Sequence, residues 1–147
     1  MVDVSAKPET RRLAVARARL HFSEGVLERV LEGRLPKGAV LETARIAGIQ
    51  GGKRTSDLIP LCHPLRITEV IVDFQPVFPA TLEVRAEVVA VDRTGVEMEA
   101  LAAVAAAALT VYDMVKAVDR GMRIDALQLL RKEGGRSGTW TAGETND

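Results

Sequence analysis

The chain has little of several residues that mark common classes of protein. Cys62 is the single cysteine among 147 residues, so no disulfide can form within the chain and a cysteine-based zinc site is not expected. Aromatic residues make up 3% and are scattered along the chain. The formal net charge is zero, which gives no global attraction to nucleic acid or to a membrane surface.

Targeting and membrane signals are also lacking. The N-terminus does not have the basic and then apolar layout of a signal peptide. The apolar run ALAAVAAAALTVY at 100–112 is too short to cross a bilayer as a helix. We therefore expect a soluble, cytoplasmic protein that forms one domain over 1–147, with flexible ends at about 1–10 and 136–147.

Lysine is scarce, because the 20 cationic residues divide into 15 arginines and 5 lysines. The ammonium of lysine is a compact charge whose pKa falls when it is buried or placed near other cations. Each lysine is therefore a candidate for proton transfer, although an ordinary surface position is the alternative and the neighbouring residues must decide. The lysines are Lys7, Lys37, Lys53, Lys116 and Lys132.

Alternating apolar residues predict strands at about 13–22, 67–74, 82–91 and 124–132, with a turn at 76–79 between the second and third. Because each of these stretches also carries polar residues at alternate positions, one face of the sheet should be solvated.

Apolar stripes at helical spacing predict three helices. The first follows Ser23 as its N-cap and stops at Gly33; the second covers about 40–50 and ends at a glycine pair. The third, from about 96 to 119, is made mostly of small residues and stops before Gly121.

The order of these elements is strand, helices, strand, strand, helix, strand. It predicts a ferredoxin-like α+β sandwich, in which helices cover one face of an antiparallel sheet in split β-α-β order, with one extra helix before the second strand. Such a fold hosts many functions and does not name one.

The stretch IAGIQGGKRTSDLIPLCHPL at 46–65 looks at first like a phosphate-binding P-loop. The P-loop needs a glycine five residues before Gly52 and a hydroxyl residue directly after Lys53, but those positions hold Ala47 and Arg54. The preceding residues also have helical spacing, whereas a P-loop follows a buried strand. We therefore predict a helix capped by glycine and followed by cations.

The third helix carries a possible acid–base constellation. Asp113 and Lys116 are three residues apart and share a helix face. Glu99 lies fourteen residues before Asp113, close to four turns, and so falls within about 40° of that face. An exposed salt bridge is the plain alternative, but ionisable groups beside an alanine-rich buried stretch are costly unless they are paired or used.

A second set of candidates lies on loops. Prolines at 60 and 64 bracket Leu61, Cys62 and His63, which fixes the direction of the imidazole and suits a ligand contact. Lysines on turns and helix ends add positive charge. Lys132 and Arg136 flank a Gly-Gly turn, where an anion could bind. Together these residues indicate an enzyme that acts on a small phosphorylated molecule without a metal cluster.

Five segments, in order along the chain, resemble the cyclic pyranopterin monophosphate synthase family, also called molybdenum cofactor biosynthesis protein C. They are MVDVSAK at 1–7, KGAVLETARIAGIQGGKRTSDLIPLCHPL at 37–65, TGVEMEAL at 94–101, ALTVYDMVKA at 108–117 and LLRKEGGRSG at 129–138.

This resemblance implies a function. The family converts (8S)-3′,8-cyclo-7,8-dihydroguanosine 5′-triphosphate into cyclic pyranopterin monophosphate and pyrophosphate, a phosphorus–oxygen lyase reaction. Its members have a ferredoxin-like fold and form homohexamers, trimers of dimers, with the active sites at the dimer interface. No cofactor or metal is implied, and whether Mg²⁺ accompanies the triphosphate stays open.

Matching positions imply the site residues. Asp113, Lys116 and Lys37 correspond to catalytic residues of the family. Substrate-binding positions are Leu61, Cys62, His63, Met98, Glu99, Lys53 and Lys132.

The hypothesis that follows is acid–base catalysis by Lys116 and Asp113, with Lys37 as a second proton donor or acceptor. The competing interpretation is a non-catalytic ferredoxin-like module that binds a phosphorylated effector or RNA. The scattered aromatics and the neutral charge weigh against RNA.

Overall fold

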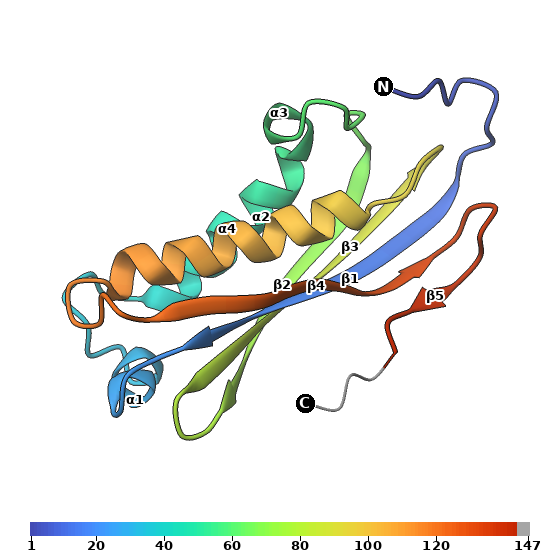
Figure 1. Cartoon of the computed structure of the whole chain (residues 1–147). Helices are drawn as coiled ribbons and strands as arrows, with labels where there is room; N and C mark the ends of the chain where they lie inside the picture. The colour runs from blue at the N-terminus through green and yellow to red at the C-terminus, as the bar shows by residue number, and fades with distance from the viewer. Residues whose placement is uncertain (144–147) are drawn as a thin grey trace.

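The computed structural model describes residues 1–143; the part of the expected flexible end at 144–147 lies outside it. Five antiparallel strands form one sheet in the order β2-β3-β1-β4-β5, which is the ferredoxin-like order with one added strand (Figure 1). The elements are β1 (Thr10–His21), α1 (Val26–Leu31), α2 (Val40–Lys53), α3 (Thr55–Leu58), β2 (Ile67–Val77), β3 (Thr81–Asp92), α4 (Glu97–Val115), β4 (Arg123–Glu133) and β5 (Trp140–Thr141).

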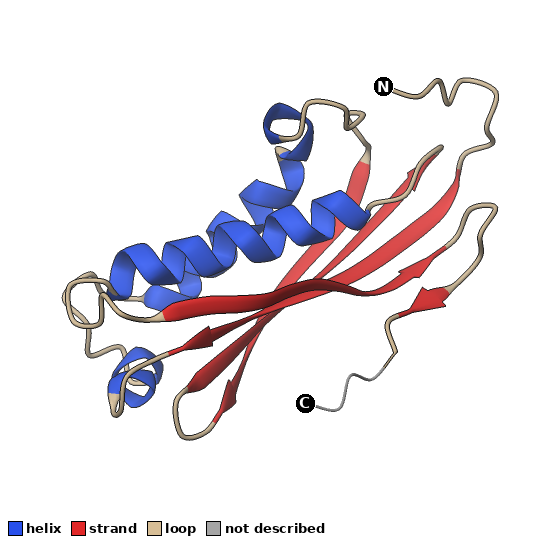
Figure 2. Cartoon of the chain, viewed as in Figure 1, coloured by secondary structure: helices blue, strands red, loops and turns tan. Residues whose placement is uncertain are grey.

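Helices α2 and α4 lie side by side over one face of the sheet, as predicted, while α1 lies at one end of it (Figure 2). The alternation of β1 explains this arrangement. Ala14, Ala16, Ala18 and Leu20 point to the helices and are fully buried, and their small size lets α4 approach the sheet. The core is therefore a thin layer between the sheet and two closely packed helices.

The glycine pair does not end α2, contrary to the prediction. The helix continues through Gly51 and Gly52 to Lys53, because these glycines face α4 and are buried there. A Cβ atom on Gly51 would lie 2.5 Å from the Cβ of Ala106 and 2.9 Å from the carbonyl oxygen of Ala102. The glycines therefore serve helix packing, and neither a cap nor a phosphate loop is formed.

Ser23 also differs from its predicted role as a helix cap, since α1 begins at Val26 after Gly25. The backbone N–H and Oγ of Ser23 donate instead to the buried carboxylate of Asp119, at 2.7 and 3.0 Å. Helix α4 ends at Val115, earlier than predicted, because the segment that follows turns so that Asp119 can accept these bonds.

Short elements and strand ends show the remaining differences. Strand β2 runs through Pro76, which was predicted in the turn; β2 is an edge strand, where a missing N–H is tolerated. Helix α3 and strand β5 were not predicted, because two to four residues are too few to show a periodicity. Strand β5 pairs Trp140 with Lys132.

Helix α4 is long and apolar enough, by length and composition alone, to cross a membrane. Half of that stretch is buried inside the fold, against α2 and the sheet. This is the behaviour of the core helix of a soluble domain.

Candidate active site

Two lysines from distant parts of the chain converge on Asp113 at the C-terminal end of α4. The Nζ of Lys37 lies 2.6 Å from Oδ2 of Asp113, and the Nζ of Lys116 lies 2.7 Å from Oδ1. Lys37 also donates to the backbone carbonyl of Asp113, at 3.0 Å. Each carboxylate oxygen thus holds one ammonium group, which places two potential proton donors side by side.

A tight turn presents Lys37 to the helix. The N–H of Gly38 donates to the carbonyl of Leu35 at 3.0 Å, and Pro36 fits the second position of such a turn. Leu35 is buried in the core and anchors the turn, and Gly38 has a φ of 82°, which glycine adopts without strain. The sequence Pro36-Lys37-Gly38 therefore fixes the position of Lys37 beside α4.

The two lysines hold the pKa of Asp113 down at about 2, through hydrogen bonds from Lys116 first and Lys37 second. Asp113 is therefore a carboxylate at neutral pH. All three side chains are about half exposed in the single chain, so the group is open to a ligand.

The proline-bracketed loop lies at the other end of α4. Leu61, Cys62 and His63 line a cavity of about 260 Å³ together with Met98 and Glu99 from the first turn of the helix. The loop is irregular, as predicted, and Leu61 is 69% exposed. An apolar rim with an imidazole, a thiol and a carboxylate suits a flat heterocycle with hydrogen-bonding edges.

Glu99 is the most unusual titratable group of this cavity. Its side chain is buried, with 3% of the residue exposed, and desolvation raises its pKa to about 7. The neighbouring charge of Glu97 adds to the rise. Burial, with help from Glu99, also raises the pKa of the Cys62 thiol. Near neutral pH Glu99 can therefore both accept and give a proton.

The remaining predicted lysines lie at the same end of the molecule. Lys53, at the end of α2, lines a small cavity with His63 and Glu99. Lys132, on β4, donates to Ser137 and, at 2.8 Å, to the carbonyl of Gly138. Lys132 thereby holds the loop between β4 and β5.

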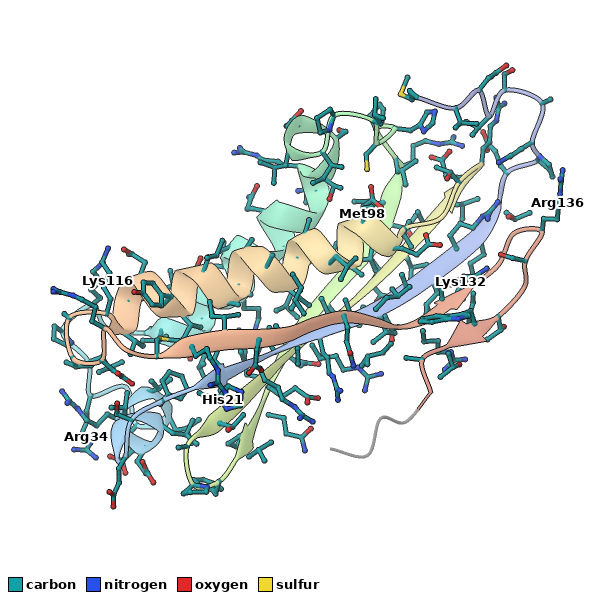
Figure 3. The ribbon with its side chains drawn as sticks, viewed as in Figure 1. His21, Arg34, Met98, Lys116, Lys132 and Arg136 are labelled. Carbon is teal, nitrogen blue, oxygen red and sulfur yellow. The ribbon has the colours of Figure 1, made fainter. Side chains whose placement is uncertain are left out.

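The structure therefore places the predicted residues in two groups. Figure 3 shows Lys116 at one end of α4, and Met98, Lys132 and Arg136 toward the other. Fourteen residues of helix separate Glu99 from Asp113, which corresponds to about 20 Å along the axis. The two groups therefore lie at opposite ends of the helix within one chain.

Sequence reasoning missed two arginines. Arg12 and Arg93 line a cavity of about 730 Å³ with Lys132 and Arg136, next to the cavity of Glu99. The signal was present: Arg12 shares the inward parity of the buried alanines of β1. Within residues 1–143, no group of three or more His, Cys, Asp or Glu side chains is placed to hold a metal ion.

Comparisons with known proteins show the family of the chain. The MoaC family matches residues 1–135. A cyclic pyranopterin monophosphate synthase of Thermomicrobium roseum is 62% identical over 141 residues, which are 95% of this chain and 85% of that protein. Proteins of the same name from Rhodospirillum rubrum and Listeria monocytogenes are 55% and 52% identical, over 97% of this chain and 86% and 89% of their own lengths. The chain belongs to the MoaC family.

Proposed function

We propose that this chain, as a single domain, is a cyclic pyranopterin monophosphate synthase. It converts (8S)-3′,8-cyclo-7,8-dihydroguanosine 5′-triphosphate into cyclic pyranopterin monophosphate and pyrophosphate, in the cytoplasm. Relatives that bear this name and are 52–62% identical support the proposal. No resident cofactor is proposed.

The observation that carries the proposal is that Lys37 and Lys116 both form ion pairs with Asp113. We call these three residues the Lys–Asp–Lys cluster. Rebuilding a purine as a pterin requires several proton transfers, and two adjacent ammonium groups can supply and recover protons. The Asp113 carboxylate stays ionised, so it orients both ammonium groups and stabilises their charge. The cations also stabilise the charge that develops when a substrate hydroxyl attacks the α-phosphate and pyrophosphate leaves.

The active site is composite in this proposal. The Lys–Asp–Lys cluster of one chain lies next to the 61–63 loop, Met98 and Glu99 of a second chain. Within one chain, about 20 Å of α4 separates the cluster from these residues. A two-fold dimer forms two such sites at once, and a homohexamer built as a trimer of dimers holds six.

Turnover of the cyclised GTP derivative tests the function, with pyrophosphate release as the readout. Lys37→Ala and Lys116→Ala should each lower kcat about a hundredfold or more, since general acid–base groups contribute about that much. Arg34→Ala is the matched control, because Arg34 is an exposed cation near the same turn that pairs with Glu32.

Two results would reject the assignment. Wild-type rates in both lysine variants would rule out proton transfer by Lys37 and Lys116. An assembled wild-type protein that binds the nucleotide but releases no pyrophosphate would favour the non-catalytic module, which binds a phosphorylated effector.

A further inference from the structure

The turn after α4 buries a carboxyl group that does not belong to the Lys–Asp–Lys cluster. This group is the side chain of Asp119, a residue that is 5% exposed. Among the residues that the structure describes, its oxygens accept hydrogen bonds from Ser23 alone, at 2.7 Å from the backbone N–H and 3.0 Å from Oγ. Burying a carboxyl group is costly unless it is hydrogen-bonded, so the burial of Asp119 depends on Ser23.

Ser23 begins a segment that ends with the turn of Lys37. The N–H of Val26 donates to the carbonyl of Ser23 at 3.2 Å, which ties Ser23 to the start of α1. The apolar face of α1 is buried, and so is Leu35, which anchors the turn of Lys37. We call this stretch, residues 23–38, the lysine-bearing segment, and its start and its end are both fixed to the fold.

Asp119 belongs to the turn that carries the other lysine of the cluster. The N–H of Asp119 donates to the carbonyl of Val115, the last residue of α4, at 3.0 Å, so the chain folds back directly after Lys116. The hydroxyl of Tyr112 donates to the carbonyl of Arg120, the next residue, at 3.2 Å. The turn therefore keeps Asp119 and Lys116 in a fixed relation to each other.

Two pairs of residues join the lysine-bearing segment to the end of α4 and its turn by hydrogen bonds. Among the described residues, these pairs are Lys37 with Asp113 and Ser23 with Asp119. Figure 3 shows Arg34, which belongs to the segment, at the same end of the molecule as Lys116. The first pair is part of the cluster and about half exposed, whereas the carboxyl group of the second is buried.

We propose that Asp119 and Ser23 are positioning residues for the reaction, because their contact holds the lysine-bearing segment against the end of α4 and keeps Lys37 on Asp113. The inference rests on the proposed function for the identity of the reaction. Without this contact the turn of Lys37 is free to move away from α4. A catalytic group that is misplaced by about 1 Å can cost a factor of about a hundred in rate.

Turnover of the cyclised GTP derivative by the assembled full chain tests the positioning role. Asp119→Ala should lower kcat about tenfold or more and change KM by less than about threefold, because the substrate-binding residues at the other end of α4 stay in place. Asp119→Asn should stay within about threefold of the wild type, since its Oδ1 can accept from the N–H of Ser23 while its Nδ2 donates to Oγ.

The matched control is Asp73→Ala. This substitution also removes a carboxylate, one that is 68% exposed on β2 and paired with Arg45. It should change kcat by less than about twofold, because an exposed ion pair contributes little and Asp73 belongs to neither group of the proposed site.

Two further variants separate positioning from a folding defect. Ser23→Ala removes only the Oγ bond of an exposed residue, so it should fold normally and lower kcat a few-fold. In a Lys37→Ala background, Asp119→Ala should cause no further loss, because a residue that acts through Lys37 has no effect once that lysine is gone. A general loss of folded protein would lower turnover by the same factor in both backgrounds.

Brief acetylation with acetic anhydride, quantified for each lysine by mass spectrometry, gives a readout that needs no turnover. Lys37 donates to two oxygens of Asp113, which slows its reaction with the reagent. Its acetylation should rise several-fold in Asp119→Ala and stay unchanged in Asp119→Asn. Lys7, an exposed lysine outside the cluster, is the internal reference.

The outcomes separate the two proposals. The inference is overturned, and the function left standing, by wild-type kcat in Asp119→Ala, by an equal loss in the Lys37→Ala background, or by an Asp119→Asn protein as defective as Asp119→Ala. Unchanged acetylation of Lys37 in Asp119→Ala overturns it as well. A rise in Lys37 acetylation confined to Asp119→Ala, in a protein whose wild type releases no pyrophosphate, supports the positioning contact and rejects the function.

Discussion

Glu99 shows how burial, with a smaller effect from the charge of Glu97, changes the pH at which a side chain titrates. Its pKa rises from 4.5 to about 7, mainly because the protein replaces the water that would stabilise its charge. A raised pKa means that the folded protein binds the proton more tightly than the unfolded chain does. Glu99 therefore costs no stability below pH 4.5, and the cost grows as the pH rises through 7.

The variant Glu99→Gln should remove this pH dependence. We expect the wild-type free energy of unfolding to fall between pH 5 and pH 8 by up to about 3 kcal/mol more than that of the variant. Urea unfolding at both pH values measures the difference. Equal slopes for the two proteins would mean that Glu99 does not titrate in this range.

The contacts of some residues can be predicted from the sequence, and those of others cannot. The three-residue spacing of Asp113 and Lys116 on one helix is sufficient to predict their contact, and the structure confirms it. Lys37 stands 76 positions from Asp113, and no local pattern pairs them. Arg12 was missed because the predicted strand began at about residue 13, whereas β1 begins at Thr10 and includes Arg12.

At the scale of elements, the contact between α2 and α4 explains the glycine-rich stretch. By helix propensity and capping rules, two adjacent glycines predict the end of a helix, because these rules describe a helix without its neighbours. The close approach of a second helix reverses this preference. The same limit applies to the end of α4, where the bond between Asp119 and Ser23 is a tertiary contact.

The variant Gly51→Ala should therefore destabilise the protein even though alanine favours helices. A methyl group 2.5 Å from the Cβ of Ala106 forces the helices apart, at a cost of about 1–3 kcal/mol after the gain in propensity. Unfolding by urea at fixed protein concentration measures the change. Gly143→Ala is the control, because open space surrounds that residue; an equal or more stable Gly51→Ala protein would contradict the packing account.

For the whole molecule, the strand order follows from the element order, and the ferredoxin-like prediction is confirmed for this reason. The partnership of two chains that we propose does not follow in the same way. Periodicity describes how a chain buries its own apolar faces, whereas the two groups at the ends of α4 combine residues from loops, turns and helix ends that no periodicity links. Only the family resemblance pointed to a shared site.

Mixing two defective chains tests the composite site. Lys116→Ala and His63→Ala should each be nearly inactive alone, and co-refolded mixtures should recover up to roughly a quarter of wild-type activity, since half of the dimers are mixed and each has one intact site. Mixing Lys116→Ala with Lys37→Ala should recover nothing, because both lesions fall in the same group. No recovery in the first mixture would place each site within one chain.

If the two ends of α4 belong to different active sites, as we propose, the length of the helix has a direct consequence for the assembly. The helix then works as a ruler that sets the spacing between neighbouring reaction centres. Adding one residue would lengthen it by about 1.5 Å and turn one end by about 100° relative to the other. Such an insertion could leave either centre aligned, but never both.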